Sequence, residues 1–399
     1  MSEIYDVIVV GGGPSGATAA TELARQGYAV ALLDRAGRIK PCGGAIPPRL
    51  IEDYAIPDSL LVAKVKSARM VAPSSKNVDI PIEGGFVGMV DRDVFDEWLR
   101  ERAAAAGATR YTGTFERFER DDLGRPLIHY RPEGGERRGG DLETIRAKAV
   151  IGADGARSKV GRQTIEGAER TPCVFAYHEI IKSPEEGTGA DFDGTRCDVI
   201  YNGTYSPDFY SWVFPHGKCT SIGTGSANKG FSLRGSVEAF RKANGMADCE
   251  TIRKEGAPIP LKPLKRWDNG RDVLLAGDAA GVVAPSSGEG IYYAMVAGSE
   301  AALAVGEFLA SGDARALMSA RKRFMKSHGN VFRVLGMMQH YWYSSDNRRE
   351  RFVKICNDKD VQKLTFDAYM TKRLVRAKPM AHIRIFFKNI AHLTGLAPT

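Results

Sequence analysis

The chain has 399 residues, of which 43% are hydrophobic and 26% charged, and its formal net charge is +8. This composition is that of a globular protein, long enough for two or three structural units. No apolar run approaches the about 20 residues that a membrane-spanning helix needs, and six cysteines without CxxC spacing argue against a disulfide framework or a zinc site.

The chain begins with "MSEIYDVIVVGGG", which has no basic region followed by an apolar segment and therefore predicts a cytoplasmic protein. The longer segment "YDVIVVGGGPSGATAATELARQGYAVALLDRA" is an apolar strand, a GxGxxG turn, an Ala-rich helix and a second strand that ends in Asp34. Gly11 permits a tight turn, Gly13 lets the backbone approach a pyrophosphate, and Gly16 allows close helix–strand packing.

Asp34 follows Gly16 by 18 residues, where a carboxylate accepts a hydrogen bond from a ribose hydroxyl and disfavours a 2′-phosphate. The segment therefore predicts FAD or NAD. The expected cofactor contacts from this segment are Gly11, Gly13, Pro14, Ser15, Gly16, Asp34 and Arg35.

Three features follow along the chain. A Cys-Gly-Gly sequence lies in "KPCGGAIPP", soon after the second strand. The stretch "DRDVFDEWLRERAAAAG" predicts an amphipathic helix that begins near Arg92. The stretch "AKAVIGADGARSKVGR" predicts a strand followed by Asp154 and Gly155.

The runs "CDVIYNG", "FYSWVFP" and "CTSIGTG" predict short antiparallel strands with turns between them. Tyr210, Trp212 and Phe214 alternate in the second run before Pro215, so a strand would point three large rings to one side. Two interpretations remain open: the rings fill the core of a sheet, or they form a wall against which an apolar ligand lies.

The stretch "RDVLLAGDAAGVVAPSSGEGIYYAMVAGSEAALAV" predicts a strand, then Gly277 and Asp278, then a loop and a long helix of small residues. Pro285, Gly288 and Gly290 lie in that loop.

Residues 321–399 contain 17 Lys and Arg against 5 Asp and Glu, which is +12, whereas residues 1–320 sum to −4. A basic, aromatic-rich helical region suits an anionic membrane surface. A solvated helical bundle that caps the main body is the alternative. We find no nucleic-acid recognition motif and expect no nucleic-acid partner.

The GxGxxG, central Asp-Gly and late Gly-Asp motifs occur in order and at matching separations. In this the chain resembles the para-hydroxybenzoate hydroxylase-like superfamily, which implies FAD as the cofactor. The resemblance implies cofactor contacts from Arg92, Asp154, Gly155, Gly277, Asp278, Pro285, Gly288, Gly290 and Ile291. For Arg92, a surface arginine in the first helical turn is an equal alternative.

The expected fold class is α/β (α+β), with a Rossmann-like FAD-binding domain, an inserted antiparallel-sheet substrate domain and a C-terminal helical region. The FAD-binding domain would comprise 1–62, 91–167 and 268–320. The substrate domain would comprise 63–90 and 168–267, and the basic helical region 321–399.

The YxWxFP pattern of Tyr210, Trp212 and Phe214 resembles the signature of the geranylgeranyl reductase family, as does the segment with Cys42, Gly43 and Gly44. That family usually has a third glycine where this chain has Ala45. The basic C-terminal region is similar to the branch that acts in chlorophyll and bacteriochlorophyll synthesis. The resemblance implies reduction of the geranylgeranyl group of a (bacterio)chlorophyll, or of geranylgeranyl diphosphate, to phytyl. It also implies that Cys42, Gly43 and Gly44 lie at the cofactor.

A C20 polyprenyl chain offers nothing to hydrogen-bond, so a protein holds it only by burial, at about 25 cal/mol per Å² of apolar area. The rings of Tyr210, Trp212 and Phe214 would supply a flat wall and favour cationic character on the alkene. An isolated alkene is a poor hydride acceptor, so proton addition accompanied by flavin hydride transfer is the cheaper route. Cys42, Tyr210 and Tyr292 are candidate proton donors by residue type, although each has a purely structural alternative.

The electron donor is open between NADPH and reduced ferredoxin, because the chain has no second GxGxxG. Arg157, Lys159 and Arg162 form a basic cluster that could receive NADPH phosphates. The rival functions are a flavin monooxygenase or halogenase, although the halogenase WxWxIP motif is absent, and a non-catalytic flavin-bound carrier of pigment or prenyl lipid. We expect a cytoplasmic location, or a peripheral one on the photosynthetic membrane, and no metal.

Overall fold

The computed structural model describes residues 4–35, 37, 39–133, 142–185, 190–363 and 372. The chain divides into two compact units. The first unit comprises Met1–Lys40, Arg92–Cys173 and Pro258–Phe332, and the second comprises Pro41–Asp91, Val174–Ala257 and Arg333–Thr399. Each unit is therefore assembled from separated segments.

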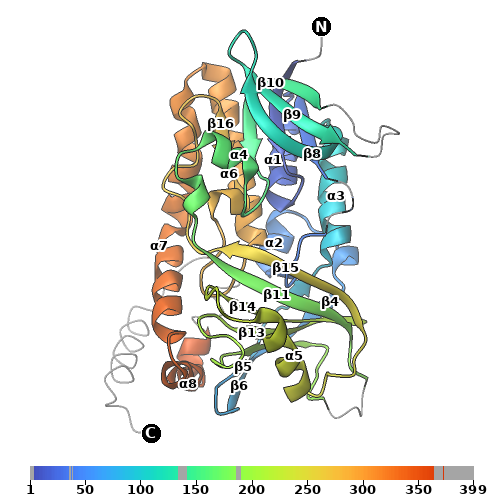
Figure 1. Ribbon diagram of the computed structural model, residues 1–399, viewed down its shortest axis with the longest axis vertical. Coiled ribbons are helices and arrows are strands. Elements are labelled where there is room, and N and C mark those ends of the chain that lie inside the picture. The colour runs from blue at the N-terminus through green and yellow to red at the C-terminus, as the bar shows by residue number, and fades with distance from the viewer. Residues whose placement is uncertain are drawn as a thin grey trace. The chain divides into compact units, whose positions relative to one another are not determined.

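The first unit is built on a six-stranded sheet in which β1 pairs in parallel with β2 and β10 (Figure 1). Its strands are β1 (Ile4–Val10), β2 (Val30–Asp34), β8 (Thr109–Arg120), β9 (Pro126–Pro132), β10 (Glu143–Gly152) and β16 (Val273–Leu275). The central strands are almost entirely buried, as parallel strands covered on both faces must be, which explains the continuous apolar run at the N-terminus. Only β9 is antiparallel, to β8 and to the first half of β10.

Helices flank this sheet. They are α1 (Pro14–Arg25), α3 (Arg92–Ala105), α4 (Lys159–Thr164), α6 (Ile291–Ser311) and the first part of α7 (Met318–Trp342), with 3-10 turns η2 (Ala168–Arg170), η3 (Gly277–Ala280) and η4 (Ala314–Leu317). Helices α1 and α6 pack so closely that a Cβ on Gly298 would lie 2.3 Å from the Ser15 carbonyl oxygen. The small residues of both helices permit this contact.

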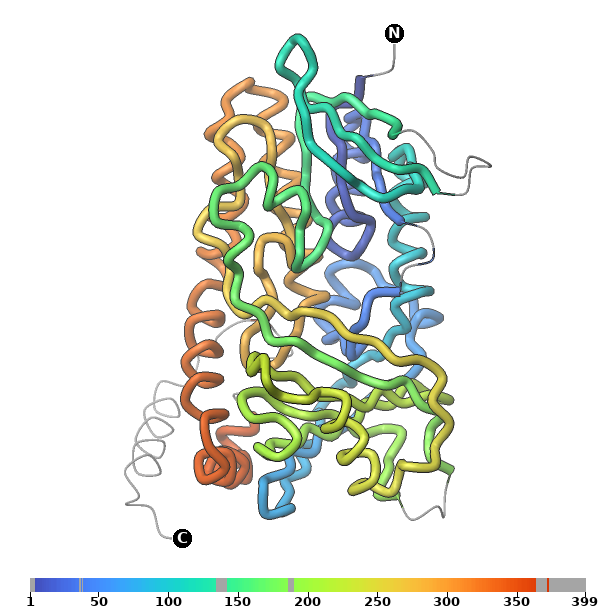
Figure 2. The backbone as a smooth tube through the Cα atoms, viewed as in Figure 1, coloured from blue at the N-terminus to red at the C-terminus, as the bar shows by residue number. Residues whose placement is uncertain are grey.

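The second unit contains a seven-stranded sheet in the order β15-β11-β14-β13-β12-β5-β6 and a three-stranded sheet in the order β3-β7-β4. The strands are β3 (Ala45–Ile46), β4 (Ala63–Val65), β5 (Ser67–Val71), β6 (Asn77–Pro81), β7 (Val87–Met89), β11 (Cys173–Lys182), β12 (Arg196–Ile200), β13 (Ser211–His216), β14 (Cys219–Ser226) and β15 (Thr251–Pro260). The remaining elements are α2 (Pro48–Asp53), η1 (Asp58–Leu60), α5 (Leu233–Ala243) and α8 (Asp346–Ile355). The long strands β11 and β15 run side by side (Figure 2). The predicted antiparallel sheet is present, with a parallel β12–β5 pair as an exception.

The boundaries of the units differ from the predicted domains at several places. Residues 168–173, 258–267 and 321–332 belong with the first unit. Residues 41–62 belong with the second unit, because β3 pairs with β7, which also pairs with β4. Residues from Arg333 onward also belong there, because α8 is tied to the second unit. The Gly203 amide donates to Asp346 at 2.9 Å, and the Ser74 hydroxyl donates to Glu350 at 2.7 Å. Residues 364–371 and 373–399 of the predicted basic region lie outside the described residues.

Among the described residues, α6 alone is long and apolar enough to span a membrane, with a mean hydropathy of 1.2, so the expectation that no stretch reaches this limit was wrong. Half of its apolar window is buried within the protein, and Gly298 packs against α1. The helix is therefore accounted for as the core helix of the first unit.

Candidate functional site

The glycines of the first turn differ in what surrounds them. Gly11 has φ +105°, and a Cβ there would lie 2.3 Å from the Ala153 carbonyl oxygen. A Cβ on Gly16 would lie 1.8 Å from the Gly11 carbonyl oxygen, whereas a Cβ on Gly13 would meet nothing within 4 Å. Packing therefore requires glycine at the first and third positions, and the open space beside Gly13 leaves room for a ligand at the backbone.

The N-terminus of α1 is suited to an anion. Its N-cap is Gly13, no side chain caps it, and Pro14 occupies its first turn. The Ser15 hydroxyl is buried and has no hydrogen-bond partner among the described residues. Uncapped backbone amides and an unpaired buried hydroxyl together fit a pyrophosphate, which accepts hydrogen bonds from both.

The late Gly-Asp motif meets the same helix end. Gly277 has φ +66°, and a Cβ there would lie 2.7 Å from the Ser15 Cβ. The buried carboxylate of Asp278 forms an ion pair with Lys40. A Cβ on Gly290, the uncapped N-cap of α6, would lie 3.7 Å from the other carboxylate oxygen. Two of the predicted motifs thus converge, and Lys40 joins them although sequence reasoning gave it no role.

Asp34 lines a cavity of about 180 Å³ together with Arg35, Glu97, Arg100 and Arg110. Its Oδ2 lies 3.1 Å from Arg100 Nη1. Burial raises the pKa of the Asp34 carboxyl above its usual value, although hydrogen bonds and the Arg100 charge act in the opposite direction. Arg100 also donates to the Gly12 carbonyl at 3.4 Å, so it bridges the dinucleotide turn and the acid. The sequence offered no signal for Arg100 beyond its place on the amphipathic helix.

Two predicted cofactor residues are engaged by their own helices. Arg92 is buried and donates from Nε and Nη2 to both carboxylate oxygens of Asp96, each at 2.7 Å, so the surface-arginine alternative was wrong. The Asp154 carboxylate accepts from the hydroxyl of Ser158, the N-cap of α4, at 2.5 Å and from the Lys159 amide in the first turn of that helix at 2.6 Å. Only the backbone of Asp154 lies at the dinucleotide turn, where its nitrogen would be 2.9 Å from a Cβ on Gly11.

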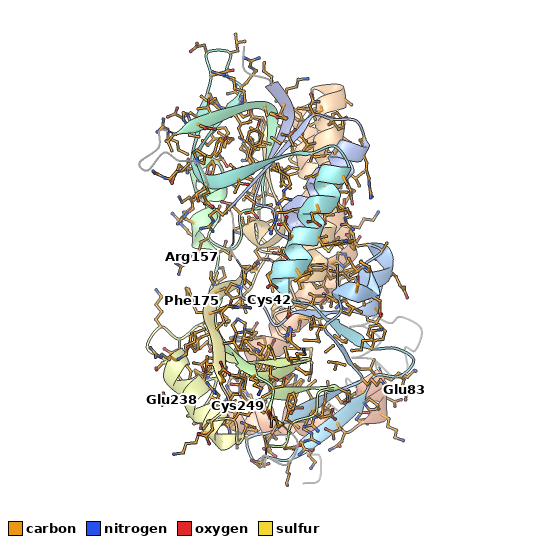
Figure 3. All side chains as sticks on the ribbon, turned by 90° about the vertical axis from the view of Figure 1, so that its right-hand side faces the viewer. Cys42, Glu83, Arg157, Phe175, Glu238 and Cys249 are labelled. Carbon is orange, nitrogen blue, oxygen red and sulfur yellow. The ribbon has the colours of Figure 1, made fainter. Side chains whose placement is uncertain are left out.

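The basic cluster after β10 is partly neutralised. Arg157 is exposed (Figure 3) and its carbonyl accepts from Arg162 at 3.2 Å. Lys159 Nζ lies 3.0 Å from the Glu116 carboxylate. The predicted recipient of NADPH phosphates therefore carries less positive charge than its sequence indicates.

Tyr210, Trp212 and Phe214 form a continuous row of contacting rings in the second unit, which we call the aromatic row. The centroids of Tyr210 and Trp212 are 6.0 Å apart, and those of Trp212 and Phe214 are 6.2 Å apart. Tyr210 also stacks on Phe209 at 4.2 Å. Tyr210 and Trp212 are mostly buried and Phe214 is half-buried. The predicted alternation places the three rings together, packed within the unit.

The Cys-Gly-Gly segment packs against this row. A Cβ on Gly43 would lie 3.0 Å from Phe214 Cδ2. His216, at the end of the same strand, lies 3.1 Å through Nε2 from the Gly43 carbonyl oxygen and 2.9 Å through Nδ1 from Asp91. Gly44 has φ +70°, and a Cβ there would lie 2.5 Å from His216 Cε1. Two motifs far apart in the sequence are thus one structure, and His216, which sequence reasoning missed, links them.

The three candidate proton donors fall in different units. Cys42 (Figure 3) and Tyr210 belong to the second unit, and the Cys42 sulfur accepts from the Gly44 amide at 3.4 Å. Tyr292 belongs to the first unit, where its buried ring packs edge-on against Tyr293 at 5.3 Å and against His328 at 6.1 Å. Pro285, Gly288 and Ile291 lie in and after the loop that leads into α6. Within the described ranges, no group of three or more His, Cys, Asp or Glu side chains is placed to hold a metal ion.

Comparison with known proteins shows the family of the chain. Residues 4–176 match the FAD binding domain family. The chain is 58% identical over 394 residues to the geranylgeranyl diphosphate reductase of Rhodobacter capsulatus, covering 99% of this chain and 98% of that protein. It is 35% identical to the chloroplastic geranylgeranyl diphosphate reductase of Oryza sativa, over 97% of this chain and 86% of that protein. A geranylgeranyl bacteriochlorophyll reductase-like protein of Thermoplasma acidophilum has the same fold, with a TM-score of 0.80 and 24% identity over 95% of this chain and 99% of that one. The chain therefore belongs to the geranylgeranyl diphosphate reductase family, within the FAD-dependent hydroxylase-like superfamily.

Proposed function

We propose that this FAD-dependent geranylgeranyl reductase reduces the isolated double bonds of a geranylgeranyl group to phytyl in photosynthetic pigment synthesis. The acceptor would be geranylgeranyl diphosphate or a geranylgeranylated (bacterio)chlorophyll, and NADPH would supply the electrons. The names of the Rhodobacter and rice relatives support the diphosphate, and the protein would work in the cytoplasm or at the surface of the photosynthetic membrane.

The residues of the first unit fit FAD. The open backbone at Gly13 and the unpaired Ser15 hydroxyl would hold the pyrophosphate, and Asp34 in its cavity would accept from the adenosine ribose. Asp278, beside the uncapped end of α6, would take the ribityl region. When bound, FAD supplies the hydride.

The single observation that carries the proposal is the packing of the Cys-Gly-Gly segment on the aromatic row. Gly43 lies against Phe214, and a Cβ there would be 3.0 Å from the ring, which would have to move by a few tenths of an ångström. The Cys-Gly-Gly segment and the YxWxFP pattern both resemble sequences of this family, and here they pack together into one apolar feature. A prenyl chain lying on it would be held by burial, at about 25 cal/mol per Å² of apolar area.

The aromatic row also bears on the chemistry. An isolated alkene has no carbonyl to spread negative charge, so a proton must arrive as the hydride does. Cys42 is the donor we favour, because its neighbour Gly43 packs on Phe214. The π faces of the aromatic row would stabilise the positive character that the proton creates on the alkene.

An anaerobic assay tests this function. Purified FAD-loaded protein is incubated with NADPH and, in separate arms, with geranylgeranyl diphosphate or with geranylgeranylated bacteriochlorophyll. The mass of the product is then measured by mass spectrometry. We expect successive gains of two hydrogens, and the arm that reacts identifies the acceptor. Reduction by dithionite in a parallel set separates a wrong electron donor from a wrong acceptor. An oxygenated product formed only in air would mean a monooxygenase, and reduced flavin that binds the substrate without being reoxidised would mean a carrier.

A further inference from the structure

A chain of polar side chains lies directly behind the aromatic row, within the second unit. The Trp212 indole donates from Nε1 to the Ser221 hydroxyl oxygen at 3.1 Å. The same hydroxyl lies 2.9 Å from His178 Nδ1, and His178 Nε2 lies 3.1 Å from a carboxylate oxygen of Glu255. The four residues come from β13, β14, β11 and β15, which are neighbours in that order.

Three of the four residues are buried, and Glu255 at the end of the chain is partly buried. Trp212 is 6% exposed, His178 3% and Ser221 not at all. Burying such groups costs free energy unless each is paired. Every member here is paired, since Arg253 forms an ion pair with the other oxygen of Glu255. A sheet that needed only stability would fill the space with apolar side chains, so the polar chain calls for a different explanation.

Chemistry fixes the direction of two of these hydrogen bonds. An indole N–H can only donate, so the Ser221 oxygen accepts from Trp212. A carboxylate can only accept, so His178 Nε2 donates to Glu255, whereas the bond between Ser221 and Nδ1 can run in either direction, because a hydroxyl oxygen accepts two hydrogen bonds. Burial acts to raise the pKa of Glu255, but the bond from His178 and the nearby Arg253 charge outweigh it and lower that pKa, so an ionised acceptor ends the chain.

This Ser–His–Glu order is that of a hydrolytic triad, but the arrangement is not one. The Ser221 hydroxyl has no exposure to any substrate, and its oxygen already accepts from Trp212. What the arrangement does hold is the indole. The ring covers Gly223 of β14, where a Cβ would be 2.4 Å from Trp212 Cζ2, and the Ser221 bond selects one of its two flips.

We propose that Ser221, His178 and Glu255 are positioning residues that hold the Trp212 ring in the one orientation that receives the prenyl chain. This rests on the proposed function of the aromatic row. Glu255 holds His178, His178 holds the Ser221 hydroxyl, and that hydroxyl orients the ring.

A double-mutant cycle with a matched control tests the proposal. Ser221→Ala is expected to raise KM for the geranylgeranyl substrate about five-fold, the effect of one hydrogen bond, with kcat and FAD content unchanged. The same substitution in a Trp212→Phe background should have no further effect, because phenylalanine has no N–H to hold. Ser211→Ala is the control: its hydroxyl is equally buried on β13 but donates to Thr224 at 3.0 Å. An undiminished Ser221→Ala effect in the Trp212→Phe background, or an equal effect of Ser211→Ala, would overturn the proposal.

A second readout needs no turnover. In NMR spectra, the indole N–H resonance of Trp212 is identified by its absence in Trp212→Phe. The proton should exchange slowly with solvent in the wild type, and faster in Ser221→Ala and His178→Leu. His178→Gln, which retains an amide donor and acceptor, should restore part of the protection. If the indole proton is protected from exchange but the protein does not reduce the prenyl substrate, the proposed function is wrong and the hydrogen-bond chain still holds the ring. If the protein reduces the substrate but the indole proton is not protected, only the positioning role is wrong.

Discussion

Asp34 places a carboxylate in an enclosed cavity, where we propose that it accepts a hydrogen bond from the adenosine ribose. Because its pKa is raised, folding favours the protonated form, and the apo protein loses stability as pH rises through the unfolded value of about 3.9 and then the raised folded value. Asp34→Asn should therefore stabilise the apo protein at neutral pH and not at strongly acid pH. The same change should weaken FAD binding about 10-fold to 100-fold, since the ribose loses a charged acceptor.

Thermal melts of the apo protein across pH, paired with FAD titration by fluorescence quenching, check both effects of Asp34→Asn. Arg100 retains Glu97 as a partner at 2.8 Å in the variant, so it is not left as an uncompensated charge. Equal FAD affinity of the two proteins would show that the ribose lies elsewhere.

Cys42 is the residue that we propose as the proton donor of the reaction. If its thiol delivers the proton, Cys42→Ala should lower kcat about 100-fold or more, while the flavin absorbance of the purified protein stays the same. Cys219→Ala is a fair comparison, because Cys219 is also partly buried in the second unit and lies outside the Cys-Gly-Gly segment. An unchanged kcat would remove Cys42 as the donor and shift attention to Tyr210→Phe.

At the scale of the strand, β13 presents the aromatic row as one feature, so its rings should share one role. Trp212→Leu keeps an apolar side chain and should raise KM for the prenyl substrate, while FAD content stays intact because the residues that would hold the pyrophosphate, the adenosine ribose and the ribityl region lie in the first unit. Phe240→Leu on α5 supplies the comparison, since that ring is equally buried in the second unit but outside the row. Substrate titrations and the flavin-to-protein absorbance ratio measure both, and loss of FAD in Trp212→Leu would mean that the row is structural.

Features that depend only on residues close together in the chain could be predicted from the sequence. Gly16 is required by the backbone of Gly11 only five residues before it, and the alternation of rings along and just before β13 follows from the period of a strand. Contacts between distant segments could not be predicted. Lys40 and Asp278 are 238 residues apart, and His216 and Gly43 are 173 apart. The pairing of Arg92 with Asp96 is different, because the two residues are four apart on one helix and their spacing is visible in the sequence.

The sequence predicted a FAD-binding domain, a substrate domain and a separate C-terminal region, whereas the chain divides into two compact units and residues 41–62 belong with the second. These residues carry the short strand β3, and the pairing of β3 with β7 decides its unit. A strand of two residues has too little pattern to reveal its partner in a sequence. The sequence therefore indicated both folds and their order, but it could not show where the chain passes from one to the other.

The charge of the whole molecule is divided as sharply as its fold, with +12 in residues 321–399 and −4 in the rest. Full-length protein should therefore bind vesicles that contain phosphatidylglycerol more tightly than phosphatidylcholine alone, and added salt should reverse this, since each cation near such a surface contributes about 1 kcal/mol. Lys322→Glu with Lys326→Glu, both exposed on α7, should weaken binding in a vesicle flotation assay. Lys218→Glu with Lys229→Glu, an equal change of charge at exposed positions outside the basic region, should weaken it less. If both pairs of substitutions weaken binding equally, net charge alone attracts the protein to the vesicles. If binding does not depend on the charge of the lipid, the basic region is a solvated cap.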